Sequence, residues 1–374
     1  MTTTPTIPTI KDASGIISPA MVIFRDRLLA NIDAMIRIAG DPSRLRPHCK
    51  THKTREVVEL QIERGITRHK CATFAEAQML VEAGVADICL AYNLVGPNID
   101  RAVTFRTTYP DVVFSATADH ADPIRDLGAA MSAAGTDIGL LLDIDTGQHR
   151  TGVGVGDQAA ELYRLIAETD GVTPAGFHVY DGHQHQEDRD ERRQAVDAEF
   201  NRVVSFRDQL VAEGLDVPCM VAGGTASFPI YAEKSDPTIQ LSPGTCVYND
   251  GGYGSYFPDM VFPPAAAVLT RVVSRPTDDR VTLDLGYKAI ASDPPMGTRV
   301  YFPDLPDAKQ VLQNEEHLVL QTDRAPEYSP GDVLLGIPWH VCPTSALHRQ
   351  VFVIDEGELV DRWDVASRDR WITI

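Results

Sequence analysis

The sequence contains no long hydrophobic run, and no stretch approaches the roughly 20 unbroken apolar residues that a membrane-spanning helix needs. The N-terminal segment Met1–Lys11 is rich in Thr and Pro, and it lacks the basic start and apolar core of a secretory signal. We therefore expect a cytoplasmic protein that has no membrane partner.

Paired cysteine spacings are also absent. The six cysteines are scattered along the chain, at Cys49, Cys71, Cys89, Cys219, Cys246 and Cys342. In a large chain without a secretory signal, this distribution favours reduced thiols over a disulfide framework.

Positive charge is scarce, because 34 Lys and Arg residues stand against 53 Asp and Glu residues and give a formal net charge of −19. This excess of negative charge argues against nucleic acid or an anionic membrane as a partner. It leaves a small substrate open, since local charge in a cleft can oppose the global sign. The length of 374 residues and the apolar content of 43% suit one large barrel with a smaller second domain.

From about residue 20 to residue 250, short β-like runs alternate with longer segments of helical periodicity. We expect strands at Ala20–Phe24, Leu45–His48, Lys70–Thr73, Asp87–Leu90, Val112–Ala116, Ile138–Ile144, Ala175–Tyr180, Val217–Ala222 and Ile239–Pro243. Repeated strand–helix units indicate parallel strands with crossover helices, and a count near eight predicts a (β/α)₈ barrel. The rival is an open doubly wound sheet, but no Gly-x-Gly-x-x-Gly motif follows the first strand.

After about residue 250 the predicted strands follow one another without a long helical pattern. They are expected at Ala265–Val273, Arg280–Leu285, His317–Gln321, Asp332–Ile337 and Gln350–Ile354. We predict an α/β chain with a barrel domain over residues 20–250. Residues 251–374, together with residues 1–19, are predicted to form a mostly antiparallel β domain.

The first candidate site residue is Lys50, in the segment RPHCKTHK at residues 46–53. It would lie at the C-terminal end of an early barrel strand, where the catalytic residues of such barrels collect. A lysine amine condenses with an aldehyde cofactor when it is neutral, which burial and nearby positive charge favour. The alternative interpretation of such a basic segment is a solvated surface.

Two glycine turns follow two successive late strands. The first is Gly223-Gly224-Thr225, and the second is Pro243-Gly244-Thr245. Glycine lets backbone N–H groups approach a phosphate closely, and the loops after late barrel strands often hold phosphate. The pair of turns therefore predicts a phosphate cup, whereas either one alone is typical of an ordinary turn.

The segment Pro338–Thr344 contains His340 and Cys342. In an extended conformation, a His-x-Cys pair points both side chains to the same face. Imidazole and thiolate suit zinc or a similar metal, and two protein ligands leave positions open for water and substrate. The alternative is a packed His and Cys without a metal.

A histidine-rich loop follows the strand at residues 175–180. Tyr180 is a candidate to stack on an aromatic cofactor, and Asp181, His183 or His185 is a candidate to move a proton. The same loop is also compatible with a plain surface turn. Arg150, after another strand, is expected either to lie near a cofactor or to pair with Asp145.

Taken in order, these segments resemble the family that contains D-threonine aldolase and eukaryotic-type D-serine dehydratase. This family belongs to the alanine-racemase-like barrel class of pyridoxal-phosphate enzymes. The likeness extends from Pro19 to the end of the chain. It rests on RPHCKTHK at 46–53, LLDIDTGQHRTGV at 141–153, VAGGT at 221–225, QLSPGTCVYND at 240–250, LDLGYKAIASD at 283–293 and GDVLLGIPWHVCPTSALH at 331–348.

The resemblance implies that Lys50 bears pyridoxal phosphate, that the Gly-Gly-Thr segment holds its phosphate and that Arg150 lies near its ring. It also implies that His340 and Cys342 bind a divalent metal ion, such as Zn, Mn or Mg. A homodimer is implied as well.

The predicted function is a lyase acting on small D-3-hydroxy amino acids. The leading choice is D-threonine-aldolase-type cleavage to glycine and an aldehyde, because the whole motif set is most similar to that branch. The alternative is D-serine or D-3-hydroxyaspartate dehydration to a keto acid and ammonia, which Cys342 favours. An amino-acid racemase and a non-enzymatic cofactor carrier are weaker alternatives, since neither needs the metal pair.

Overall fold

The computed structural model describes residues 6–370 of the chain. Contacts between Cα atoms divide this part into two compact units. The β unit comprises residues 6–35, 51–57 and 245–368, and the barrel unit comprises residues 36–50, 58–244 and 369–370. The domain boundaries expected at residues 20 and 250 stay a prediction.

The barrel unit contains a seven-stranded parallel sheet whose strands follow in sequence order from β2 to β8. Each strand overlaps one of the predicted β runs, and all of them except β2 (RHKC) consist mainly of apolar residues. The strands are β2 (Arg68–Cys71), β3 (Asp87–Asn93), β4 (Val113–Ala118), β5 (Ile138–Asp143), β6 (Val172–Val179), β7 (Met220–Ala222) and β8 (Ile239–Leu241).

The predicted segment Leu45–His48 closes this sheet. Leu45 forms a parallel bridge with Leu241 of β8, and His48 forms one with Lys70 of β2. Since β8 and β2 are the two edge strands, the segment occupies the remaining position of the barrel. The predicted (β/α)₈ barrel is therefore confirmed.

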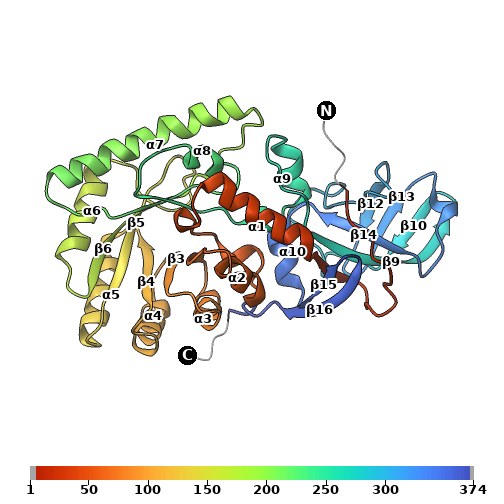
Figure 1. Cartoon of the computed structure of the whole chain (residues 1–374), viewed down its shortest axis with the longest axis horizontal. Coiled ribbons are helices and arrows are strands. Elements are labelled where there is room, and N and C mark those ends of the chain that lie inside the picture. Colours follow the sequence, from red (N-terminus) through yellow and green to blue (C-terminus); the bar gives the residue numbers. More distant parts are fainter. Residues whose placement is uncertain (1–5, 371–374) are drawn as a thin grey trace. The chain divides into compact units, whose positions relative to one another are not determined.

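Helices alternate with the strands, as crossover connections require. They are α1 (Arg25–Ala39), α2 (Arg55–Ile62), α3 (Phe74–Glu82), α4 (Pro97–Thr108), α5 (Ala121–Ala133), α6 (Asp157–Glu168), α7 (Arg189–Ala212) and α8 (Phe228–Ala232). Figure 1 shows α3 to α6 on the outside of strands β3 to β6. Side-chain caps mark helix starts, such as Thr73, whose hydroxyl accepts the Glu76 N–H at 3.1 Å. Within residues 6–370, no helix combines the length and hydrophobicity needed to cross a bilayer.

The β unit is built on a mostly antiparallel, nine-stranded sheet. Its path runs β12-β13-β10-β9-β1-β15-β16, with β14 paired to β9 and β11. The strands are β1 (Ala20–Phe24), β9 (Ala266–Thr277), β10 (Arg280–Leu283), β11 (Val300–Tyr301), β12 (Lys309–Gln313), β13 (Leu318–Gln321), β14 (Val333–Pro338), β15 (Gln350–Asp355) and β16 (Glu358–Asp364). The expected second sheet is confirmed, and β1 joins it by pairing antiparallel with β9 and parallel with β15.

Two short helices of the β unit were not expected, α9 (Gly251–Tyr256) and α10 (Val341–Leu347). Helix α10 corrects the prediction that His340 and Cys342 lie in an extended strand. His340 is the N-cap with an extended backbone, and Cys342 belongs to the first helical turn. The local signal is weak because the helix spans only 7 residues and contains Pro343.

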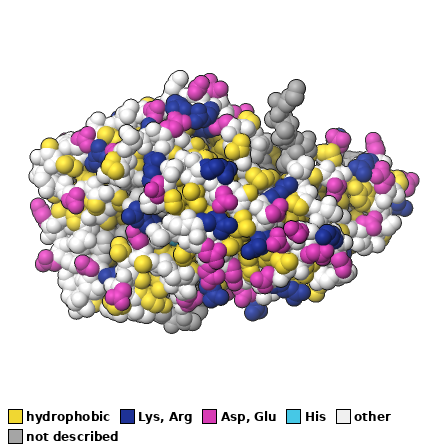
Figure 2. All heavy atoms as spheres, in the orientation of Figure 1, with side chains coloured by type: hydrophobic (Ala, Val, Ile, Leu, Met, Phe, Trp, Pro, Cys, Tyr) yellow, Lys and Arg dark blue, Asp and Glu magenta, His cyan; other side chains and the backbone are white. Residues whose placement is uncertain are grey.

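The surface carries both signs of charge despite the net charge of −19. Figure 2 shows basic side chains interspersed among acidic ones over the face in view. Such mixing is typical of a solvated surface, as the sequence indicates.

Candidate functional site

Tyr180 follows strand β6 directly and is the centre of a group of cationic side chains in the barrel unit. The amines of Lys50 and Lys70 lie 5.8 and 5.7 Å from the centroid of its ring, and the guanidinium carbon of Arg150 lies 5.0 Å away. The structure therefore brings Lys50, Arg150 and Tyr180 together, as the motifs predict. Cations at this range are attracted by the negative face of the ring.

Lys50 lies in a single 3₁₀ turn, Cys49–Thr51, immediately after the barrel-closing segment. The backbone N–H of Lys50 donates to Nδ1 of His48 at 3.3 Å, which fixes the turn. Because the turn follows a barrel strand, the half-buried side chain starts from the carboxyl end of the barrel.

Lys70 was not predicted as a site residue. It lies on β2 and is only 2% exposed, and burial lowers the pKa of its amine to about 7. The repulsion of Lys50 acts in the same direction, and attraction to Cys89 opposes it. It was missed because β2 has the sequence RHKC and looks like an ordinary polar strand.

A second unpredicted feature is a hydrogen-bonded pair of Asp143 on β5 and His178 on β6. Nδ1 of His178 lies 2.7 Å from Asp143 Oδ1, and both side chains are buried. Burial opposes ionisation of Asp143, but the hydrogen bond and charge of His178 outweigh it and lower the pKa of the carboxyl. Burial lowers the pKa of His178 itself, although Asp143 opposes this. The ring of His178 stacks beside Tyr180 at 6.5 Å, and its buried Nε2 has no hydrogen-bond partner within residues 6–370.

The two predicted glycine turns are joined by a hydrogen bond from the Gly244 N–H to the Thr225 hydroxyl at 3.2 Å. Gly223 has a φ of +78°, which glycine adopts without strain. A Cβ added to Gly224 would lie 3.1 Å from Tyr180 Cε2. The lack of side chains thus leaves backbone next to the Tyr180 ring, which suits close approach of a phosphate-bearing group.

The carboxylate of Asp181 is turned toward the first glycine turn. Its Oδ1 accepts the Ser227 hydroxyl at 2.7 Å, and the Ser227 oxygen in turn accepts the Gly224 N–H at 3.1 Å. Asp181 is 3% exposed, and burial raises the pKa of its carboxyl. His183, the other predicted proton-transfer residue, is half-buried, and its Nδ1 has no hydrogen-bond partner in the described part of the chain.

In the β unit, His340 and Cys342 interact directly. Burial opposes protonation of His340, but the Cys342 sulfur and the Asp293 carboxylate raise the pKa of the imidazole to about 9. Burial also opposes ionisation of Cys342, yet His340 and the hydroxyls of Thr245 and Thr51 lower the pKa of the thiol. These hydroxyls lie 3.5 and 3.3 Å from Sγ. Thr245, predicted to complete the phosphate cup, therefore contacts the sulfur of Cys342.

The donor set at His340 and Cys342 fits a divalent metal. Asp293 Oδ2 lies 2.5 Å from Nδ1 of His340, so the carboxylate orients the imidazole and leaves Nε2 for a metal. A nitrogen and a thiolate sulfur are ligands that zinc accepts. Buried Asp250 accepts the N–H of Val341 at 2.9 Å and thereby holds the residue between the two candidate ligands.

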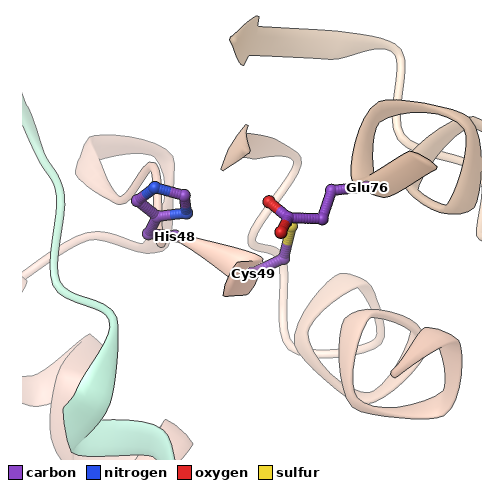
Figure 3. Close-up of side chains that lie close together, drawn as sticks. All are labelled: His48, Cys49 and Glu76. Carbon is purple, nitrogen blue, oxygen red and sulfur yellow. The ribbon is translucent and has the colours of Figure 1, made fainter. Parts of the chain in front are cut away.

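A second group of metal-type side chains consists of His48, Cys49 and Glu76 in the barrel unit. Their potential ligand atoms lie within 4.8 Å of one another and are buried. Figure 3 shows the Cys49 sulfur against the Glu76 carboxylate and the His48 ring apart from this pair. Glu76 Oε2 accepts the Ala72 N–H at 2.6 Å and lies 3.8 Å from Cys49 Sγ. The carboxylate is therefore satisfied by protein donors without an ion.

A cavity of about 450 Å³ opens at the amino ends of the barrel strands, away from Tyr180. Arg46 in its wall pairs with Asp87 at 2.8 Å and donates to Gln240 at 2.6 Å. The charge of this buried arginine is thus compensated, which is typical of a stabilising role at this end of a barrel.

Two family models match the chain in succession. "Alanine racemase, N-terminal domain" matches residues 23–251, and "Putative serine dehydratase domain" matches residues 265–354. Both matches agree with the resemblance that the motifs predict.

Relatives with assigned names match over nearly the full length. The chain is 30% identical to D-threonine aldolase of Arthrobacter sp., over 94% of this chain and 92% of the relative. It is 28% identical to 3-hydroxy-D-aspartate aldolase of Paracoccus denitrificans strain Pd 1222, over 96% and 94%. It is 27% identical to D-threo-3-hydroxyaspartate dehydratase of Delftia sp. strain HT23, over 93% and 96%.

The fold has a solved counterpart of the same extent. The crystal structure of D-threonine aldolase from Filomicrobium marinum superposes with a TM-score of 0.88 at 27% identity, covering 97% of this chain and 98% of the other. Since one family model spans more than half of the 374 residues and a relative is 30% identical along 94% of them, the chain belongs to the alanine racemase N-terminal-domain family.

Proposed function

We propose that this protein is a lyase that acts on D-3-hydroxy amino acids with pyridoxal phosphate and a divalent metal ion, with D-threonine-aldolase-type cleavage as its main reaction. The observation that carries the proposal is the convergence of Lys50, Arg150 and the Gly224 backbone on the Tyr180 ring. The full-length relatives are named aldolases and a dehydratase, which are all lyases.

The cofactor would be held by residues of the barrel unit. Lys50 would supply the amine, Tyr180 the stacking face, and the linked turns at Gly223–Thr225 and Gly244 the phosphate contacts. Arg150 would lie near the ring of the cofactor. When bound, pyridoxal phosphate accepts electrons from the substrate α-carbon.

The metal would be held by His340 and Cys342 of the β unit, with Asp293 orienting the imidazole. It would act as a Lewis acid on the substrate β-hydroxyl. Cys342 is suited to this because His340 and two threonine hydroxyls favour its thiolate form.

Removal of the β-hydroxyl proton requires a base in the histidine-rich loop. Asp181 is ill suited, because it is only 3% exposed and its Oδ1 accepts the Ser227 hydroxyl, although its Oδ2 has no partner in the described chain. His183 keeps a ring nitrogen without a hydrogen-bond partner in the described part of the chain. We assign the proton transfer to His183 and a positioning role to Asp181.

The second candidate function is dehydration of D-serine or D-3-hydroxyaspartate. Cys342 favours it, as does the match of residues 265–354 to the serine dehydratase model. Here the base would take the α-proton, and the Lys50 amine is the candidate for this step.

Product analysis of the metal- and cofactor-loaded protein tests the proposal. D-Threonine should give glycine and acetaldehyde, and both should stop on chelation and resume when metal is added. Pyruvate and ammonia from D-serine as the faster reaction would favour the dehydratase. Binding of the cofactor without turnover of any D-3-hydroxy amino acid would contradict both, as would racemisation that survives chelation.

We also propose that the protein is a homodimer, as other barrels of this class are. Sedimentation or light scattering of the loaded protein should give about twice the chain mass of 41.0 kDa. A monomeric and fully active protein would contradict this part of the proposal.

A further inference from the structure

Lys70 is a buried cation that the proposed mechanism does not use. It is 2% exposed and lies on β2, where side chains alternate between the two faces. Its neighbour His69 contacts Gln61 of α2 at 3.0 Å on the outer face. Lys70 therefore points into the barrel, and its amine reaches 5.7 Å from the Tyr180 ring centroid.

The Lys70 amine has no hydrogen-bond or ion-pair partner within residues 6–370. In contrast, Lys234 pairs with Asp197, and Lys288 pairs with Glu315 and Glu316. Burying an ammonium without a partner is unfavourable, so burial lowers the pKa of Lys70 to about 7. The unloaded protein thus keeps an amine that a suitable acceptor would stabilise as the cation.

The groups that face this amine come from several barrel segments. They are Lys50 after the closing segment, Cys89 on β3, Asp143 on β5, and His178 and Asp181 on or after β6. Asp143 is already paired with His178, and Asp181 with Ser227. Two acceptor atoms remain, Nε2 of His178 and Oδ2 of Asp181, and both are buried without a hydrogen-bond partner in the described chain. An unused donor and unused acceptors near one aromatic ring indicate a place for a ligand or a bridging water.

We propose that Lys70 is a further cofactor-binding residue, whose ammonium donates a hydrogen bond to an acceptor atom of bound pyridoxal phosphate. This inference rests on the proposed function. Lys50 and Lys70 approach the same ring at 5.8 and 5.7 Å, and this ring is the proposed stacking face. Pyridoxal phosphate is anionic and has acceptor atoms on its ring, its phenolic oxygen and its phosphate, so it supplies the hydrogen-bond acceptor that the Lys70 amine lacks. Charge-assisted hydrogen bonds of this kind are stronger than those between neutral groups.

The test compares wild type with Lys70→Met, which keeps the side-chain length and removes the charge. Affinity for pyridoxal phosphate is measured by fluorescence titration, and thermal unfolding is measured without cofactor. Loss of one charge-assisted hydrogen bond should weaken cofactor binding about ten- to hundredfold. The unloaded variant should be at least as stable as wild type, because a buried unpaired amine is gone.

Lys234→Met is the matched control, since it removes a lysine of the same unit that already has a carboxylate partner. It should leave cofactor affinity within about twofold and should not raise the unfolding temperature. Weaker cofactor binding together with at least wild-type stability of the unloaded protein is therefore expected for Lys70→Met and not for Lys234→Met.

The pH dependence gives a readout that packing would not change. Lys70 has a pKa of about 7 without cofactor, and an anionic partner should raise it. The affinity advantage of wild type over Lys70→Met should then be complete below about pH 7 and disappear as the pH rises through the raised value. Comparing the two proteins removes the part of the pH dependence that both share.

The outcomes separate this inference from the proposed function. If wild type never binds pyridoxal phosphate, the proposed function fails. If wild type binds it and Lys70→Met binds equally well with the same pH profile, the inference fails. A water bridge between Lys70 and His178 would then explain how the buried amine is accommodated. If Lys70→Met is destabilised when unloaded, Lys70 has a structural role and the inference is again contradicted.

Discussion

The hydroxyl of Ser227 donates a hydrogen bond to Oδ1 of Asp181 at 2.7 Å and accepts the Gly224 N–H at 3.1 Å. The acid that follows Tyr180 in the sequence is thus connected to the first glycine turn. This connection explains how a carboxylate only 3% exposed is accommodated, because the hydroxyl offsets part of the burial cost. It assigns Asp181 to holding the turn in place.

The variant Asp181→Asn tests this assignment. The amide oxygen can still accept the Ser227 hydroxyl, so we expect turnover to fall less than about tenfold and both limbs of the pH–rate profile to remain. A general base would behave differently, because its removal costs about 10²–10⁴ in rate. A loss of that size together with a missing limb in steady-state kinetics would contradict the assignment.

Ser227→Ala breaks the same connection from the other side. It leaves the buried Asp181 carboxylate with one hydrogen-bond donor fewer, and it leaves the Gly224 N–H without its hydroxyl acceptor. Loss of about 1 kcal/mol of hydrogen-bond free energy should weaken pyridoxal phosphate binding about fivefold. Equilibrium dialysis measures this effect, and an unchanged dissociation constant would show that the turn does not depend on Ser227.

His183→Asn is expected to reduce cleavage about 10²–10⁴-fold while the bound cofactor keeps its visible absorption. The reason is that Nδ1 of His183 is a ring nitrogen without a hydrogen-bond partner in the described chain. His185→Asn is the matched control, because His185 is exposed in the same loop. The reverse pattern in single-turnover cleavage, with His185→Asn inactive and His183→Asn active, would transfer the role to His185.

The sequence predicted the strands of the barrel and the positions of Lys50, Tyr180 and the glycine turns, because each depends on neighbours along the chain. Apolar runs mark the buried strands, and residues just after a strand lie at the carboxyl end of a parallel barrel. The same local reasoning failed for helix α10, which has only 7 residues after the N-cap His340, with Pro343 among them.

Features that join distant segments were not predicted. The pair of Asp143 and His178 is separated by 35 positions, and Asp293 lies 47 positions before His340. Lys70 looked like part of an ordinary polar strand because its burial depends on the whole barrel around it. Such contacts are created by tertiary packing, so composition and periodicity contain no signal for them.

Asp293→Asn tests whether the carboxylate supports a metal site at His340. The carboxylate lies 2.5 Å from Nδ1 and would fix the imidazole for metal binding through Nε2. Loss of such a partner should weaken metal binding about 10–100-fold, whereas Cys342→Ala should weaken it more. Competition with a chromogenic chelator measures both affinities without relying on activity. Equal affinities in Asp293→Asn and wild type would contradict the orienting role.

Alanine at the two glycines of the first turn should separate backbone strain from crowding. Gly223 has a φ of +78°, and an added Cβ would lie 2.8 Å from Tyr231 Cδ2, so Gly223→Ala suffers from both. Gly84, with a φ of +95° and open space around it, is the control for strain alone. We expect Gly84→Ala to lose about 1–2 kcal/mol of unfolding free energy and Gly223→Ala to lose more.

Gly224→Ala has no positive φ but places a Cβ 3.1 Å from Tyr180 Cε2, so it should weaken cofactor binding with little loss of stability. Denaturant unfolding and cofactor titration of the three variants check this order, and a Gly224→Ala protein that binds pyridoxal phosphate as tightly as wild type would show that the ring of Tyr180 can shift without cost.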